Sequence, residues 1–116
     1  MKPSLLFIVS SDPRESARTA EAVRIAAGVG TWKKADVRLY LEGPAILSLT
    51  EYPDELIDED NFTRYLPIIG EFGHPVLVEK GSKFIAELGE STLPFEETDG
   101  ATLARLCAHS TNVLHF

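Results

Sequence analysis

Residues 5–15 read Leu-Leu-Phe-Ile-Val-Ser-Ser-Asp-Pro-Arg-Glu, and they join an apolar run directly to a helix start. The run Leu5–Val9 has no polar face, which is typical of a strand covered by helices on both sides of a parallel sheet. Asp12 then stands at an N-cap position, with Pro13 at N1 and Glu15 at N3. The stretch therefore predicts a central strand that passes into a helix, which we expect to end at Gly28 and Gly30.

The same alternation of strand and helix recurs along the rest of the chain. Further strands are expected at 36–41, 74–78, 93–96 and 112–116, and helices at 44–49, 62–72, 82–89 and 99–109. Pro67 lies inside the helical pattern of residues 62–72, so we expect a bent helix or two short ones that end near Gly70 or Gly73. Such an alternation implies right-handed crossovers and predicts an α/β fold: a three-layer α/β/α sandwich, flavodoxin-like, with a mostly parallel five-stranded sheet.

Length and composition indicate one domain, residues 1–116, with 44% hydrophobic residues. The apolar run Leu5–Val9 is too short to cross a bilayer, and Met1-Lys2-Pro3 has none of the features of a secretory signal. The single cysteine, Cys107, cannot form an internal disulfide, which favours a reducing compartment. We therefore expect a cytoplasmic protein that does not bind membranes.

Charge is concentrated in one segment. The formal net charge is −7, and residues 51–60 hold six acidic residues with no lysine or arginine. Without this segment the chain is almost neutral, so it has no basic surface for nucleic acid or anionic lipid. We expect the segment to be a solvated loop or an excursion beside the sheet.

Polar residues follow three of the predicted strands. In parallel sheets, ligands bind beyond the carboxyl ends of the strands. Helix N-termini at this edge would offer unpaired N–H groups to an anion, although the chain has no glycine-rich phosphate loop. The residues expected at the edge, and proposed as ligand-binding, are Ser10, Ser11, Asp12, Glu42, Gly43, Glu79, Lys80 and Ser82.

Two residues are candidates for catalysis. Glu79 stands at a strand tip that would hold it in place as a general base, and neighbouring carboxylates could raise its pKa. Cys107 follows Leu103 by one helical turn, which places it on an apolar face and indicates a buried thiol. His74, His109 and His115 show no metal-ligand spacing, so we expect no metal and no cofactor.

The chain resembles the DsrE-like sulfur-relay superfamily over nearly its whole length. The resemblance rests on residues 6–13, 20–27, 37–43 and 75–78 and on the ending Asn112-Val113-Leu114-His115-Phe116. It implies a small cytoplasmic α/β subunit that assembles into dimers, trimers or hexamers. In members that carry persulfide sulfur, a cysteine stands at or just after the third strand, a position that looks like Glu79 or Lys80 here. Neither side chain can carry a persulfide.

These observations favour a non-catalytic, DsrE-like subunit that forms homo-oligomers and binds a small polar ligand or a protein partner at the strand-end cleft. One alternative is a sulfurtransferase-like carrier that uses Cys107. Another is a small hydrolase or isomerase with Glu79 as general base. The ligand, the partner and the strand order are left open by the sequence.

Overall fold

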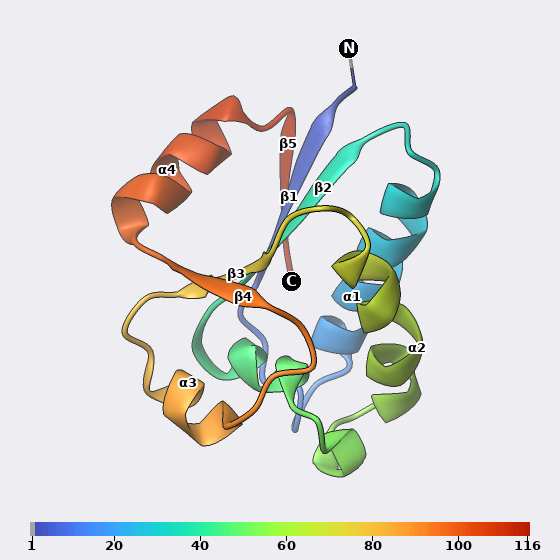
Figure 1. The fold of residues 1–116 in the computed structure, drawn as a ribbon, viewed down its shortest axis with the longest axis vertical. Coiled ribbons are helices and arrows are strands. Elements are labelled where there is room, and N and C mark those ends of the chain that lie inside the picture. The colour runs from blue at the N-terminus through green and yellow to red at the C-terminus, as the bar shows by residue number, and fades with distance from the viewer. Residues whose placement is uncertain (1) are drawn as a thin grey trace.

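The computed structural model describes residues 2–116 and shows five strands alternating with helices (Figure 1). The strands are β1 (Ser4–Val9), β2 (Asp36–Leu41), β3 (Val76–Glu79), β4 (Phe95–Thr98) and β5 (Asn112–His115). The α-helices are α1 (Arg18–Thr31), α2 (Glu59–Gly70), α3 (Lys83–Leu88) and α4 (Gly100–His109). Two 3₁₀ helices, η1 (Gly43–Leu49) and η2 (Pro53–Glu55), follow β2.

All neighbouring strands pair in parallel, in the order β4-β3-β2-β1-β5. The chain steps in one direction from β1 to β4 and then returns to the other side of β1 for β5. Because such crossovers are right-handed, α1, α2 and α3 lie on one face of the sheet and α4 lies on the other. Figure 1 shows α4 separated from α1 and α2 by the strands. The predicted three-layer α/β/α class is confirmed.

The two faces of the sheet are covered unequally. On the α1 side, the core joins side chains of β1, β2 and β3 to α1, α2, α3 and η1, and Phe7 and Phe62 are among its largest buried members. On the α4 side, the buried side chains are Leu6, Ile8, Tyr40 and Leu77. They are covered by Leu103, Leu106, Cys107 and Val113, which are only partly buried. A single short helix, α4, therefore covers this face of the sheet.

The expected helix start at Asp12 is wrong, because α1 begins six residues later at Arg18. The backbone carbonyl of Asp12 accepts hydrogen bonds from the N–H groups of Glu15 and Ser16, each at 3.0 Å, so Asp12 opens an isolated turn. Ala17 takes the N-cap position of α1 and makes no side-chain cap. The capping box read from Asp12 and Glu15 is not formed.

The expected end of this helix is also wrong, since α1 continues through Gly28 and Gly30 to Thr31. Gly30 has a packing role instead: a Cβ at this position would lie 2.2 Å from Cζ of Phe72. The glycine thus lets the aromatic ring of Phe72 lie against α1. The helix around Pro67 is a single element, α2, which ends at Gly70 as expected.

None of the helices in residues 2–116 is long and apolar enough to span a membrane. The acidic segment 51–60 is mostly exposed, as expected, but it is not all loop. Pro53–Glu55 forms η2, Leu56 is buried in the core, and Glu59 begins α2.

Candidate functional site

The carboxyl ends of β1, β2 and β3 lie side by side, so the structure brings together the three segments that the sequence places at one edge. The N–H of Glu42 donates to the carbonyl of Val9 at 3.0 Å, which joins the end of β2 to the end of β1. The N–H of Gly43 donates to Oε1 of Glu79 at 3.0 Å, which joins the end of β2 to the end of β3. The N–H of Ser10 donates to the carbonyl of Phe116, the residue after β5, at 3.0 Å.

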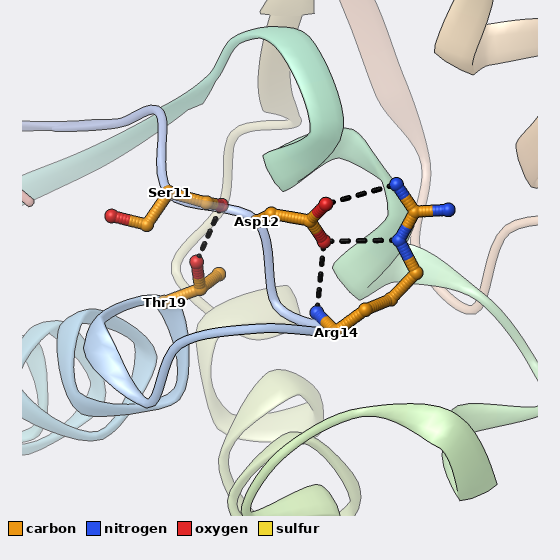
Figure 2. Close-up of polar contacts among 4 residues, drawn as sticks. All are labelled: Ser11, Asp12, Arg14 and Thr19. Carbon is orange, nitrogen blue, oxygen red and sulfur yellow. Dashed lines mark hydrogen bonds and ion pairs between the residues drawn. The ribbon is translucent and has the colours of Figure 1, made fainter.

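Asp12 belongs to this edge, but its carboxylate is held by its own loop (Figure 2). Oδ1 accepts from the backbone N–H of Arg14 at 2.9 Å and from its Nε at 3.0 Å, and Oδ2 pairs with the guanidinium at 2.9 Å. The hydrogen bonds from Arg14 hold the pKa of Asp12 below its ordinary value. Asp12 therefore stays ionised, and neighbouring carboxylates do not raise its pKa.

Behind Asp12, the side chain of Thr19 fixes the loop to the first turns of α1. Its Oγ1 donates to the carbonyl of Ser11 at 2.8 Å, and Thr19 is fully buried (Figure 2). Thr19 is a positioning residue that the sequence did not single out. A threonine one position inside a helix, near an incoming loop, carries no distinctive spacing signal.

Three of the N–H groups at this edge are occupied by the chain's own side chains. Glu79 accepts from the N–H of Gly43, and Glu97 accepts from the N–H of Gly81 at 3.1 Å. Ser82 caps α3, as expected, by accepting from the N–H of Phe84 at 3.2 Å. These three N–H groups are therefore not open to a phosphate.

Lys80 is exposed at the same edge, and its charge acts on Asp99, the residue that caps α4. Asp99 caps α4 by accepting from the N–H of Thr102 at 2.8 Å, and this bond lowers the pKa of Asp99. The charges of Lys80 and Arg105 lower that pKa further. Lys80 therefore helps to keep a helix cap ionised.

Tyr40 lies in β2, next to the carboxyl edge, which is the edge of the sheet where β1, β2 and β3 end. It was not singled out from the sequence. Its side chain is on the α4 face and is 3% exposed. Burial raises the pKa of the Tyr40 phenol, and the charges of Glu42 and Glu79 raise it further. Its position two residues before Glu42, on the same face of β2, was the available signal.

The candidate thiol lies away from this edge. Helix α4 starts after the carboxyl end of β4 and runs back to the amino end of β5. Because Cys107 is in its last turn, the thiol lies near the amino edge, the edge of the sheet where the strands begin. His109, two residues after Cys107, is bonded to the amino end of β1, since Oγ of Ser4 donates to its carbonyl at 3.3 Å. Cys107 is partly exposed and packs over the α4-side core, so the expected full burial is not seen.

The histidines are spread over the structure. His74 has Nε2 at 2.9 Å from the carbonyl of Val37, between the amino ends of β2 and β3, while His115 is on β5. Within residues 2–116, no three histidine, cysteine or acidic side chains gather in a way that would hold a metal ion.

A cavity at the opposite edge of the sheet was missed by the sequence reasoning. It measures about 490 Å³ and lies between the amino ends of the strands and the last turns of α1 and α2. Its apolar lining comes from Gly30, Val37, Ile68 and Phe72, and its polar lining includes Lys2, Lys33, Asp36, Glu71 and His74. The pairing of Gly30 with Phe72 that shapes it joins residues 42 positions apart, which no local pattern reveals.

The chain was compared with family models, curated proteins and solved structures. No family model matches, and no curated protein matches. Among solved structures, the crystal structure of the YchN protein from E. coli is similar over 100% of both chains, with a TM-score of 0.81 and 18% sequence identity. At this identity the likeness concerns the fold alone. The chain thus shares its α/β fold with this structure.

Proposed function

We propose that this chain is a non-catalytic subunit of the DsrE-like superfamily, which self-associates and recognises a small polar ligand or a protein partner at the carboxyl edge. The observation that carries the proposal is the chemistry of that edge. Three strand ends meet there, yet Glu79 is bound to the N–H of Gly43 and the thiol of Cys107 is elsewhere. An edge with polar groups and no poised nucleophile suits recognition without bond breaking.

Self-association is supported by the thin layer on the α4 face. No residue of α4 is fully buried, and Leu103, Leu106 and Cys107 remain partly exposed. The outer side of α4 presents small side chains, Ala101, Ala104 and Ala108, at helical spacing. A second copy could approach this helix closely and complete the burial of the layer.

The oligomeric state tests this part of the proposal. Light scattering of the wild-type protein should give a mass above that of one chain. Ala104→Arg, which places a long cation on the outer side of α4, should shift the protein toward the monomer. Ala86→Arg makes the same change on the exposed side of α3 and should leave the mass unchanged. A wild-type protein that is strictly monomeric would contradict the proposal.

The sulfur-carrier alternative retains one supporting observation, the partial exposure of Cys107. A carrier thiol needs an accessible sulfur and an electropositive neighbour that favours the thiolate. We expect a small alkylating reagent to modify Cys107 slowly in the folded protein and quickly in denaturant. Rapid modification of the folded protein would favour the carrier instead.

The hydrolase or isomerase alternative depends on Glu79 acting as a base. Glu79→Gln would abolish turnover of a substrate found by screening if Glu79 accepts the proton. Our proposal expects no turnover to lose in either protein.

A further inference from the structure

Two glutamates lie next to each other on the α4 face of the carboxyl edge. Tyr40 of β2 pairs with Leu77 of β3, so Glu42 and Glu79, each two residues further, come to the same face of neighbouring strands. Both side chains are half-buried. Like charges on adjacent strands destabilise a sheet unless a cation neutralises them.

The described chain supplies no such cation. Within residues 2–116, the ion pairs closer than 4.0 Å are Asp12 with Arg14 and Glu21 with Arg24. Oε1 of Glu79 has the N–H of Gly43 as donor, which leaves its second oxygen and the carboxylate of Glu42 without a basic partner in that part of the chain. Residues 2–116 thus supply these two half-buried carboxylates with one N–H donor and with no basic side chain within 4.0 Å.

Tyr40 provides a second, independent observation at the same place. Only 3% of the residue is exposed, and its hydroxyl makes no hydrogen bond to any described residue. No side-chain oxygen in residues 2–116 is both fully enclosed and unpartnered, so this hydroxyl reaches the surface. The charges of Glu42 and Glu79 act on it there. Buried tyrosines usually direct the hydroxyl to a partner. Here no residue of the described chain supplies that partner.

We propose that Glu42, Glu79 and Tyr40 bind a nitrogen cation with N–H donors, an ammonium or guanidinium group. This inference rests on the proposed recognition function and names the ligand class of that site. The carboxylates supply charge and acceptors, and the phenol oxygen supplies a further acceptor at the base. An anion would meet two carboxylates and N–H groups that are already occupied.

The cation has two possible sources, a free small molecule or a basic side chain of a protein. NMR titration at constant ionic strength should therefore use three probes: methylguanidinium, a short arginine-containing peptide and inorganic phosphate. We expect saturable shifts of the Gly43 amide with methylguanidinium and none with phosphate. Much tighter binding of the peptide would assign the cation to a protein, and equal affinity would assign it to a small molecule.

Matched variants locate the site. The double variant Glu42→Gln/Glu79→Gln keeps the shape of both side chains and should weaken methylguanidinium binding about tenfold or more, since bonds to charged groups are lost. Asp36→Asn/Glu71→Gln removes the same charge at the amino edge and should leave binding unchanged. Tyr40→Phe should weaken binding several-fold without moving the unfolding midpoint, because the hydroxyl has no partner in the described chain.

The outcomes separate this inference from the function on which it rests. Saturable phosphate binding at Gly43 would overturn the cation assignment and leave recognition at this edge intact. Binding that is equal in the wild type and the Glu42→Gln/Glu79→Gln variant would also overturn it. If no probe binds but light scattering shows an oligomer that dissociates in this variant, the cation comes from a second copy, which supports the inference. If no probe binds and the oligomer is unaffected, the inference fails.

Discussion

The carboxyl and amino edges of the sheet are built in opposite ways. At the carboxyl edge, the side chains of Glu79, Ser82 and Glu97 accept hydrogen bonds from backbone N–H groups. Within residues 2–116, Glu42 and Glu79 have no ion-pair partner closer than 4.0 Å. At the amino edge, the last turns of α1 and α2 border a cavity of about 490 Å³ that is lined by apolar side chains and by charged side chains of both signs. The difference indicates that the carboxyl edge suits a charged group that binds at its surface, whereas the cavity at the amino edge suits a small, partly apolar ligand.

The largest expected effect concerns the amino edge. Gly30→Ala places a Cβ 2.2 Å from the ring of Phe72, so the ring must move and the cavity must change shape. We expect a loss of about 1–3 kcal/mol in the free energy of unfolding, measured with urea. Gly28→Ala is the matched control, because a Cβ there meets nothing within 4 Å. It should stabilise α1 by about 0.5–1 kcal/mol. Equal effects of the two variants would contradict the packing role of Gly30.

The next effect concerns the link between β2 and β3 at the carboxyl edge. Glu79→Ala removes the acceptor of the Gly43 N–H and should cost about 1.5 kcal/mol in urea unfolding. Glu79→Gln keeps a carbonyl oxygen for this N–H and relieves repulsion with Glu42, so its stability should be close to that of the wild type. A Gln variant as unstable as the Ala variant would show that the charge, and not the hydrogen bond, holds the edge together.

A similar but smaller effect is expected at the cap of α3. Ser82→Ala leaves the N–H of Phe84 without its acceptor and should reduce stability by about 1 kcal/mol. Ser82→Asp restores an acceptor and should recover most of the loss. Thermal unfolding followed by circular dichroism would measure both variants, and no recovery with aspartate would argue against capping.

The smallest effect is a dependence on pH. Hydrogen bonds from Arg14 lower the pKa of Asp12 in the folded protein, so ionised Asp12 stabilises the fold. This contribution is fully present above the ordinary aspartate pKa of about 3.9 and is lost as the pH falls through the lower folded pKa. Arg14→Ala should flatten that part of the curve of stability against pH. Identical acid limbs for the two proteins would contradict the role of Arg14.

Much of the fold could be predicted because its signals are local. The apolar run Leu5–Val9, the alternation in Asp36–Leu41 and the cap at Ser82 each reflect neighbours in sequence, and the structure has strands or a helix start at these places. The helix start at Asp12 failed for a local reason too. Asp12 bonds to Arg14 two residues on, and an aspartate suits such a turn as well as it suits a helix cap.

The candidate site was predictable in position but not in its bonding. Chain topology brings Ser10, Glu42 and Glu79 to one edge. Which carboxylate binds which N–H depends on side-chain reach across strands, as for Glu79 and Gly43, which are 36 residues apart. The buried position of Tyr40 depends on the single helix α4 covering it, which the sequence pattern of β2 does not contain.

One NMR experiment compares the two edges most directly. Amide shifts of the wild-type protein would be mapped during titration with methylguanidinium, using Gly43 and Gly81 to report on the carboxyl edge and Gly30 and Gly73 on the amino edge. We expect saturable shifts at Gly43, with Gly30 and Gly73 unchanged. Saturable shifts confined to Gly30 and Gly73 would place recognition at the cavity and contradict a recognition site at the carboxyl edge.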